Sequence, residues 1–350
     1  MKNYFVPMRT GLCNRQWRNI QKLAFALALI TCLLTANSPA QTAKTTQSYL
    51  LVLNKAENTL AIIDPQKFDI LARIPTGEGP HEVIVSADGK TAFVANYGTQ
   101  QTLGSSLSVI DLVTRKETKR VDLGALRRPH GIVEAGGKIY FTCEVNRLVA
   151  RFDPATNSVD WIMGTGQNAT HMLVISPDQK KIYTANIASD TVTAMEFAAA
   201  PPAQSKITHI PVGKQPEGIA LSPDVRELWV GHNGDGKVSI IDTATNIVKE
   251  TVQVGEVPIR VKFTPDGKRV LISDPKSGDL IVFDAATRKQ VKRIAVGETP
   301  VGILITPDGK RAFVATMQAN RVAVINLEDL TVTHRIEPGK GPDGLAWAAY

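Results

Sequence analysis

Half of the chain's six histidines occur in one recurring local pattern. His81 and His130 each follow a proline, and His171 takes the matching place after a threonine. Glu217 and Asp343 stand at the same place in two further copies of the pattern. Imidazole and carboxylate groups are ligands of zinc, copper and iron ions, and three protein ligands leave a coordination position open for water or substrate. The predicted metal ligands are therefore His81, His130, His171, Glu217 and Asp343, provided that the fold brings them together.

The pattern that carries these residues recurs seven times along the chain. Its copies begin at residues 80, 129, 170, 216, 258, 300 and 342, and the last three spacings are equal. A tight turn such as Asp266-Gly267 follows the first strand, a strand rich in β-branched and aromatic residues comes next, and a third strand ends in Asp or Asn, as at Asp242. Four short strands per repeat without an amphipathic helix are typical of a propeller blade. We therefore predict an all-β fold, a seven-bladed β-propeller with four-stranded blades.

The two ends of the repeat region complement each other. Residues 49–77 supply a second, third and fourth strand without a first, and residues 344–348 supply a first strand alone. Joining the C-terminal strand to the N-terminal three strands would complete the seventh blade. We predict this closure because it leaves no unpaired blade edge that could aggregate.

The first strand of each blade lines the central channel of a propeller, so residues at one repeat position form a ring. In blade order the histidine position reads as an unbroken arc of Asp343, His81, His130, His171 and Glu217, which faces Ile259 and Val301. The alternative to a metal site is that the imidazoles form hydrogen bonds with neighbouring backbone at a wet channel mouth and do not converge on one ion.

The loops between second and third strands should emerge at the same mouth as this arc. Glu144, His232 and Asp274 depart there from the Asn found in other repeats, and Arg260 lies on a predicted channel strand. These four are candidates for ligand contact. The predicted cofactor-binding residues are His81, His130, His171, Arg260 and His232.

The repeat motifs resemble those of the YVTN-type β-propeller family. The resemblance rests on stretches such as Thr264-Pro265-Asp266-Gly267-Lys268 and Tyr183-Thr184-Ala185-Asn186, and it covers residues 48–349. This family is similar in turn to bacterial lactonase-like propellers and to propellers that bind d1-type haem. The resemblance implies a channel histidine as a haem ligand, a three-histidine channel metal, or a lactonase activity. The matching residues are structural, so they specify the fold rather than the function.

The first 40 residues differ in kind from the rest. They hold five basic residues, no acidic residue and an apolar run over residues 23–34, which is too short for a typical membrane span. Ser38 and Ala40 place small residues before a cleavage site at Gln41. We predict a signal peptide over 1–40, a single propeller domain over 41–350 without a transmembrane segment, and export to the periplasm or the medium. An uncleaved N-terminal anchor is the alternative.

Charge and cysteine content narrow the functional classes. Removal of the five basic residues leaves 35 basic against 33 acidic residues, so the formal charge falls from +7 to +2. The basic residues that remain are interspersed with acidic ones, and we expect no nucleic-acid binding. Cys143 is the one cysteine outside the N-terminal segment, and its strand context favours a buried small hydrophobe over a reactive thiol.

No Ser, His and Asp set appears in a nucleophile-elbow context. The first functional expectation is an exported, monomeric propeller that binds a small ligand, a cofactor or a protein partner at its channel mouth. The alternative is an enzyme or cofactor-handling protein that holds a metal ion (zinc, copper or iron) or a d1-type haem at the histidine arc. A lactonase-like hydrolase is the second alternative.

Overall fold

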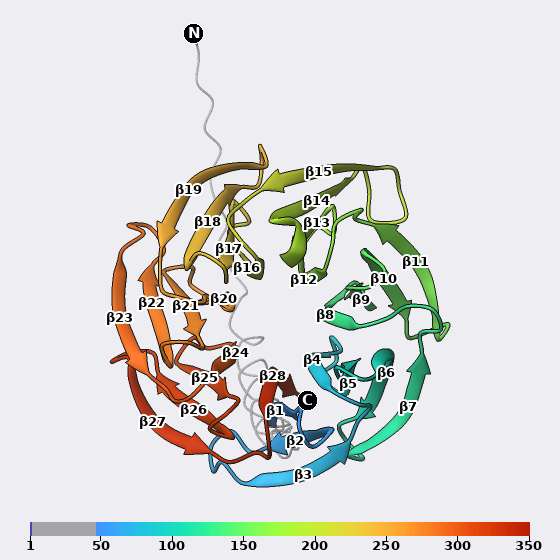
Figure 1. The fold of residues 1–350 in the computed structure, drawn as a ribbon, viewed down its shortest axis with the longest axis vertical. Coiled ribbons are helices and arrows are strands. Elements are labelled where there is room, and N and C mark those ends of the chain that lie inside the picture. Colours follow the sequence, from blue (N-terminus) through green and yellow to red (C-terminus); the bar gives the residue numbers. More distant parts are fainter. Residues whose placement is uncertain (2–46) are drawn as a thin grey trace. The chain divides into compact units, whose positions relative to one another are not determined.

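The computed structural model describes Met1 and residues 47–350. Within residues 47–350 the chain forms seven antiparallel four-stranded sheets and one short 3-10 helix, Ile187–Ser189. The sheets stand around a central axis like blades, with one strand of each nearest the axis (Figure 1). The predicted all-β, seven-bladed propeller is confirmed. The predicted signal peptide and its cleavage site lie outside the described residues.

We number the blades from the sheet that contains both chain ends of the propeller. Blade 1 consists of β28, β1, β2 and β3, and blades 2 to 7 follow in chain order. The innermost strands are β28 (Pro342–Ala349), β4 (Pro80–Val85), β8 (Pro129–Ala135), β12 (Thr170–Ile175), β16 (Pro216–Leu221), β20 (Arg260–Phe263) and β24 (Pro300–Ile305). The second strands are β1 (Ser48–Asn54), β5 (Thr91–Gly98), β9 (Lys138–Cys143), β13 (Lys181–Asn186), β17 (Glu227–His232), β21 (Arg269–Asp274) and β25 (Arg311–Thr316).

The two outer strands of each blade complete the sheets. The third strands are β2 (Thr59–Ile63), β6 (Leu103–Asp111), β10 (Leu148–Asp153), β14 (Thr191–Phe197), β18 (Lys237–Asp242), β22 (Asp279–Asp284) and β26 (Arg321–Asn326). The outermost strands are β3 (Ile70–Pro75), β7 (Lys116–Asp122), β11 (Ser158–Gly164), β15 (Ser205–Pro211), β19 (Ile247–Gln253), β23 (Gln290–Ala295) and β27 (Thr331–Ile336).

Blade 1 closes the ring as predicted. β28 pairs antiparallel with β1, so that Leu50 lies opposite Trp347 and Val52 opposite Leu345. The apolar core is divided into seven clusters, and each combines side chains from two neighbouring blades. For example, Leu51 of blade 1 packs in one cluster with Val94 of blade 2. Every blade therefore needs both of its neighbours to bury its two faces.

Aspartates of the repeat motif hold the turns between strands. Asp266 accepts hydrogen bonds from the Thr264 hydroxyl (2.6 Å) and the Lys268 amide (3.0 Å), and Gly267 between them has a φ of +70° that favours glycine. Asp242, at the turn between β18 and β19 of blade 5, accepts hydrogen bonds from the amides of Ala244 (3.0 Å) and Thr245 (2.9 Å). These turns are the structural reason for the recurrent Asp.

Cys143 is buried at the end of β9, as expected for a small hydrophobe, and burial raises the pKa of its thiol. Among the described residues, no helix is long and apolar enough to cross a membrane.

Candidate metal centre

Three adjacent innermost strands bring the predicted histidines into one stack. His81, His130 and His171 are the second residues of β4, β8 and β12. Their ring centroids lie 4.0 Å (His81 to His130) and 3.6 Å (His130 to His171) apart. Gly131 permits this approach, because a Cβ there would lie 2.7 Å from the His171 carbonyl oxygen. The arc predicted from the sequence is therefore a physical cluster.

Several polar atoms of the cluster are buried without a hydrogen-bond partner. His130 is fully buried, and neither of its ring nitrogens has a hydrogen-bond partner among residues 47–350. His81 Nδ1, His171 Nε2 and Asp343 Oδ1 share this condition. Buried polar groups normally have partners, so their concentration here is typical of a site that takes an ion, a water molecule or a ligand. For His130, the alternative of hydrogen bonding to neighbouring backbone does not hold.

His171 is held between two carboxylates. Its Nδ1 contacts Glu144 Oε1, and its Nε2 lies 3.2 Å from Glu217 Oε1 without being aligned for a hydrogen bond. The Tyr97 hydroxyl donates a hydrogen bond to the other oxygen of Glu144 (2.5 Å). Burial alone would lower the pKa of His171, but Glu217 and Glu144 outweigh it and raise that pKa to about 9. Without a bound metal ion, the His171 side chain is therefore an imidazolium at neutral pH.

The other two imidazoles are neutral. Burial lowers the pKa of His130 well below its usual range, and the positive charge on His171 adds to this effect. Burial likewise lowers the pKa of His81, together with the nearby cations Lys55 and Arg260. Their nitrogen lone pairs are thus available to a ligand at neutral pH.

Arg260 joins two glutamates across the channel. From β20 of blade 6 it reaches Glu217 of blade 5 (3.1 Å) and Glu82 of blade 2 (2.5 Å). Burial alone would lower the pKa of Arg260, but Glu82, Glu217 and Asp343 raise it further above its usual range. The predicted cofactor contact Arg260 is therefore committed to an ion-pair network inside the protein.

Asp343 completes the arc on the other side of His81. One of its oxygens lies 3.3 Å from His81 Nδ1 and 3.5 Å from Lys55 Nζ. Burial raises the pKa of Asp343 to about 6, against the opposing effect of Lys55 and Arg260. Asp343 is thus placed to orient His81 through its ring nitrogen.

One subset of the cluster has the spacing of a metal site. His130, Glu144 and His171 offer ligand atoms that all lie within 4.8 Å of one another. The structure therefore adds Glu144 of the β9–β10 turn to two of the predicted ligands. Of the other predicted ligands, Glu217 pairs with Arg260, and Asp343 lies between Lys55 and His81. Two imidazoles and a carboxylate suit zinc, iron or copper and leave coordination positions open.

His232 and Asp274 take a different role. His232 ends β17 and accepts a long hydrogen bond from the Gly213 amide (3.4 Å), while its Nδ1 lies 3.4 Å from Asp235. Asp274 ends β21 and accepts from the Glu256 amide (2.7 Å). Both residues occupy the repeat position of the recurrent Asn and fasten the loop that leads into their blade. The described contacts of His232 do not include the histidine stack.

Sequence reasoning missed Glu82 and Lys55. Glu82 of blade 2 and Arg260 of blade 6 occupy the same repeat position, which is glycine in four other blades. Two opposite charges that replace glycine at one ring position could have indicated a cross-channel pair. Lys55 lies in the β1–β2 turn, where the sequence carries no comparable signal.

A tetrapyrrole does not fit the described arrangement. His130 is fully buried, and its ring lies between those of His81 and His171. An axial ligand must present a ring nitrogen to the open face of the macrocycle, and His130 is enclosed between its two neighbours. The residues present fit a single metal ion better than a d1-type haem.

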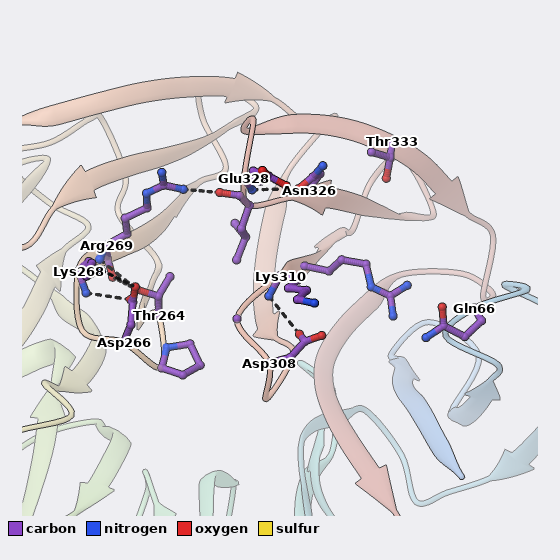
Figure 2. A pocket seen from close by; sticks show the side chains of 14 residues that line it. Gln66, Thr264, Asp266, Lys268, Arg269, Asp308, Lys310, Asn326, Glu328 and Thr333 are labelled. Carbon is purple, nitrogen blue, oxygen red and sulfur yellow. Dashed lines mark hydrogen bonds and ion pairs between the residues drawn. The ribbon is translucent and has the colours of Figure 1, made fainter. Parts of the chain in front are cut away.

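A separate hollow of about 970 Å³ lies among turns of blades 6, 7 and 1. Figure 2 shows Asp266, Asp308, Lys268 and Lys310 around it. The two aspartates accept hydrogen bonds from lysine amides of their own turns, and a further dashed line joins Arg269 of blade 6 to blade 7, where the bond is to the Leu327 carbonyl. These aspartates are the turn-forming residues of the repeat. The hollow therefore reflects repeat architecture and contains none of the predicted site residues.

Comparisons with known proteins agree with the fold. Residues 178–310 match the family model described as "Cytochrome D1 heme domain". This segment includes Glu217 and Arg260 but not the three stacked histidines or Glu144. No curated protein matches the chain.

Several solved structures are similar at low sequence identity. A functionally unknown protein from Desulfotomaculum acetoxidans has a TM-score of 0.73 at 14% identity, covering 86% of this chain and 98% of its own. A provisionally assigned 6-phosphogluconolactonase from Bacteroides uniformis has a TM-score of 0.71 at 15% identity, covering 86% and 100%. The dihydro-heme d1 dehydrogenase NirN has a TM-score of 0.62 at 15% identity, covering 90% and 78%. The chain is thus a seven-bladed propeller that is similar to the cytochrome d1 heme domain and to lactonase-like propellers.

Proposed function

We propose that this propeller binds a divalent transition metal ion at its channel mouth, through His130, Glu144 and His171. The observation that carries the proposal is the cluster in which neither ring nitrogen of the buried His130 has a hydrogen-bond partner among residues 47–350, although Glu144 and His171 lie beside it. An ion there would satisfy atoms that are otherwise costly to bury.

The residues around the ion have distinct tasks in this proposal. His130 and His171 supply nitrogen ligands and Glu144 an oxygen ligand, while Tyr97 orients Glu144 by its hydrogen bond. His81 lies beside His130, with the two ring planes tilted by 54°, and is available as a further ligand or as a proton acceptor. A bound ion of this type supplies Lewis-acid chemistry or lowers the pKa of a bound water. The site is compatible with ligand binding without turnover, which was the first expectation from the sequence.

Export and the monomeric state belong to the same proposal. The N-terminal segment supports a location in the periplasm or outside the cell, where the ion would be acquired, and the closed ring supports a monomer. N-terminal sequencing of protein purified from its host's periplasm should find Gln41 first. A chain that starts at Met1 would contradict cleavage.

The metal proposal is tested by calorimetric titration of metal-free protein with Zn²⁺. We expect one ion per chain, and loss of binding in Glu144→Gln. The matched control is Glu256→Gln, whose exposed carboxylate pairs with Lys276 and is not one of the proposed ligands. Absence of stoichiometric binding in the folded wild type would refute the proposal.

A further inference from the structure

The channel beyond the histidine cluster contains a cavity of about 710 Å³. It extends from Glu82 to the turns that hold Pro177, Pro223 and Pro265, and the innermost strands around the axis in Figure 1 form its wall. Sites for small organic ligands commonly have volumes of about 300–1,000 Å³. The cavity is thus large enough for such a molecule.

One ring of the cavity wall has seven equivalent positions. In blades 2 to 7 each pairs with the third residue of the second strand, as in Ala220 with Trp229 and Lys262 with Leu271, and in blade 1 Ala346 pairs with Leu51. Six of the seven positions carry apolar side chains, and the remaining one is a lysine. The ring consists of Ile84, Val133, Val174, Ala220, Lys262, Leu304 and Ala346.

Lys262 is a cation without a direct partner. Its side chain is exposed to the cavity, yet no ion pair or side-chain hydrogen bond joins it to any residue in 47–350. Burial inside the channel lowers the pKa of Lys262, with partial compensation from Glu82. The Glu82 carboxylate is itself bound by Arg260 at 2.5 Å. A charge within an apolar wall is stabilised when a counter-charge reaches it.

We propose that the channel binds a compact apolar molecule with one anionic group, which pairs with Lys262. The apolar ring supplies contact area for the body of the ligand, and Lys262 selects its charge. This site is separate from the metal centre, since none of the three proposed metal ligands lines the cavity.

The proposal is tested by calorimetric titration with octanoate and with 1-octanol, on protein from which metal has been removed by a chelator. Octanoate should bind the wild type, and Lys262→Met should weaken its binding by at least about tenfold, because the charge-assisted contact with Lys262 is lost. The neutral 1-octanol should bind both proteins equally. Lys206→Met is the control, since that side chain is 76% exposed on the outermost strand of blade 4.

A second variant tests the location independently of charge. Val174→Phe narrows the ring at a half-buried position and should weaken octanoate and 1-octanol alike. Absence of octanoate binding to the wild type, equal binding to Lys262→Met, or an equal loss in Lys206→Met would each overturn the proposal. Removal of metal before titration separates this outcome from that of the metal proposal.

Discussion

At the scale of single residues, His130 and His232 differ in role: His130 is a proposed metal ligand, and His232 fastens the loop that leads into its blade. Both imidazoles are fully buried, but only His232 has a hydrogen-bond partner for a ring nitrogen. We predict that His130→Asn lowers zinc affinity at least about 100-fold, because loss of a ligand should reduce metal affinity more than loss of a residue that only supports a ligand. His232→Asn restores the residue of other repeats and should leave affinity unchanged. Equal effects of the two substitutions in a zinc titration would contradict the assignment.

His171 links metal binding to protons. Its pKa of about 9 means that the folded apo protein holds a proton there at pH 7, and an ion must displace it. The apparent zinc affinity should therefore rise about tenfold per pH unit between about pH 6 and 8, with release of one proton. Calorimetry in buffers of different ionisation enthalpy measures this number. A zinc affinity that does not change with pH would show that the ion does not displace the proton of His171.

Arg260 contributes to stability through a buried network. Within residues 47–350, Arg260→Met leaves Glu82 without its cation and Glu217 with His171 as its one cationic neighbour, and we predict a loss of about 3–5 kcal/mol in the free energy of unfolding. The double variant Arg260→Met with Glu82→Gln should lose less than the sum of the single variants. Denaturant unfolding of the four proteins measures the coupling, and strict additivity would contradict a direct interaction.

At the scale of elements, the aspartates of the turns predict that the folded protein loses stability at acidic pH. Their aspartates accept backbone amide hydrogen bonds, which lower the carboxyl pKa below 3.8, for example in Asp242 and Asp284. A lowered folded-state pKa gives stability above the unfolded pKa that is lost as pH falls through the folded value. The melting temperature should already fall modestly from about pH 7 to 5, because the unfolded chain protonates His81 and His130 and the folded protein does not, and it should fall again below about pH 4 as the turn carboxylates are protonated. A melting temperature that does not fall at acidic pH would contradict this account. The other turn aspartates with lowered pKa are Asp64, Asp88, Asp153, Asp178, Asp224, Asp266 and Asp308.

The elements themselves were predictable because turn and strand signals recur in every blade. The exact start of a strand was not. The repeat pattern places Pro258 and Ile259 at the start of the blade 6 channel strand, but β20 begins at Arg260. Elsewhere the proline pairs with the end of the second strand, as Pro216 does with His232. This shorter strand carries Arg260, whose side chain reaches across the channel.

At the scale of the whole molecule, ring closure explains why the last strand matters. A chain that ends at Gly341 lacks β28, so β1 loses its partner and two interblade clusters lose side chains. We predict loss of cooperative thermal unfolding and aggregation in size-exclusion chromatography. A chain that lacks only Tyr350 is the control and should still unfold cooperatively. Normal melting of the shorter chain would contradict closure as the source of stability.

The repeat count and closure followed from the sequence, and so did the gathering of the three histidines. The identity of the ligands followed only in part. Glu144 reaches His171 from a turn, and Glu82 reaches Arg260 with blades 7 and 1 between them. Such contacts depend on side-chain direction across the channel, which repeat position alone does not specify.

The most direct measurement is anomalous diffraction at the zinc edge from crystals soaked with Zn²⁺. Our account predicts one ion at the channel mouth, about 2.0–2.2 Å from a nitrogen of His130, a nitrogen of His171 and an oxygen of Glu144. An ion bound elsewhere, or a mouth that takes none while the histidine stack is ordered, would contradict it.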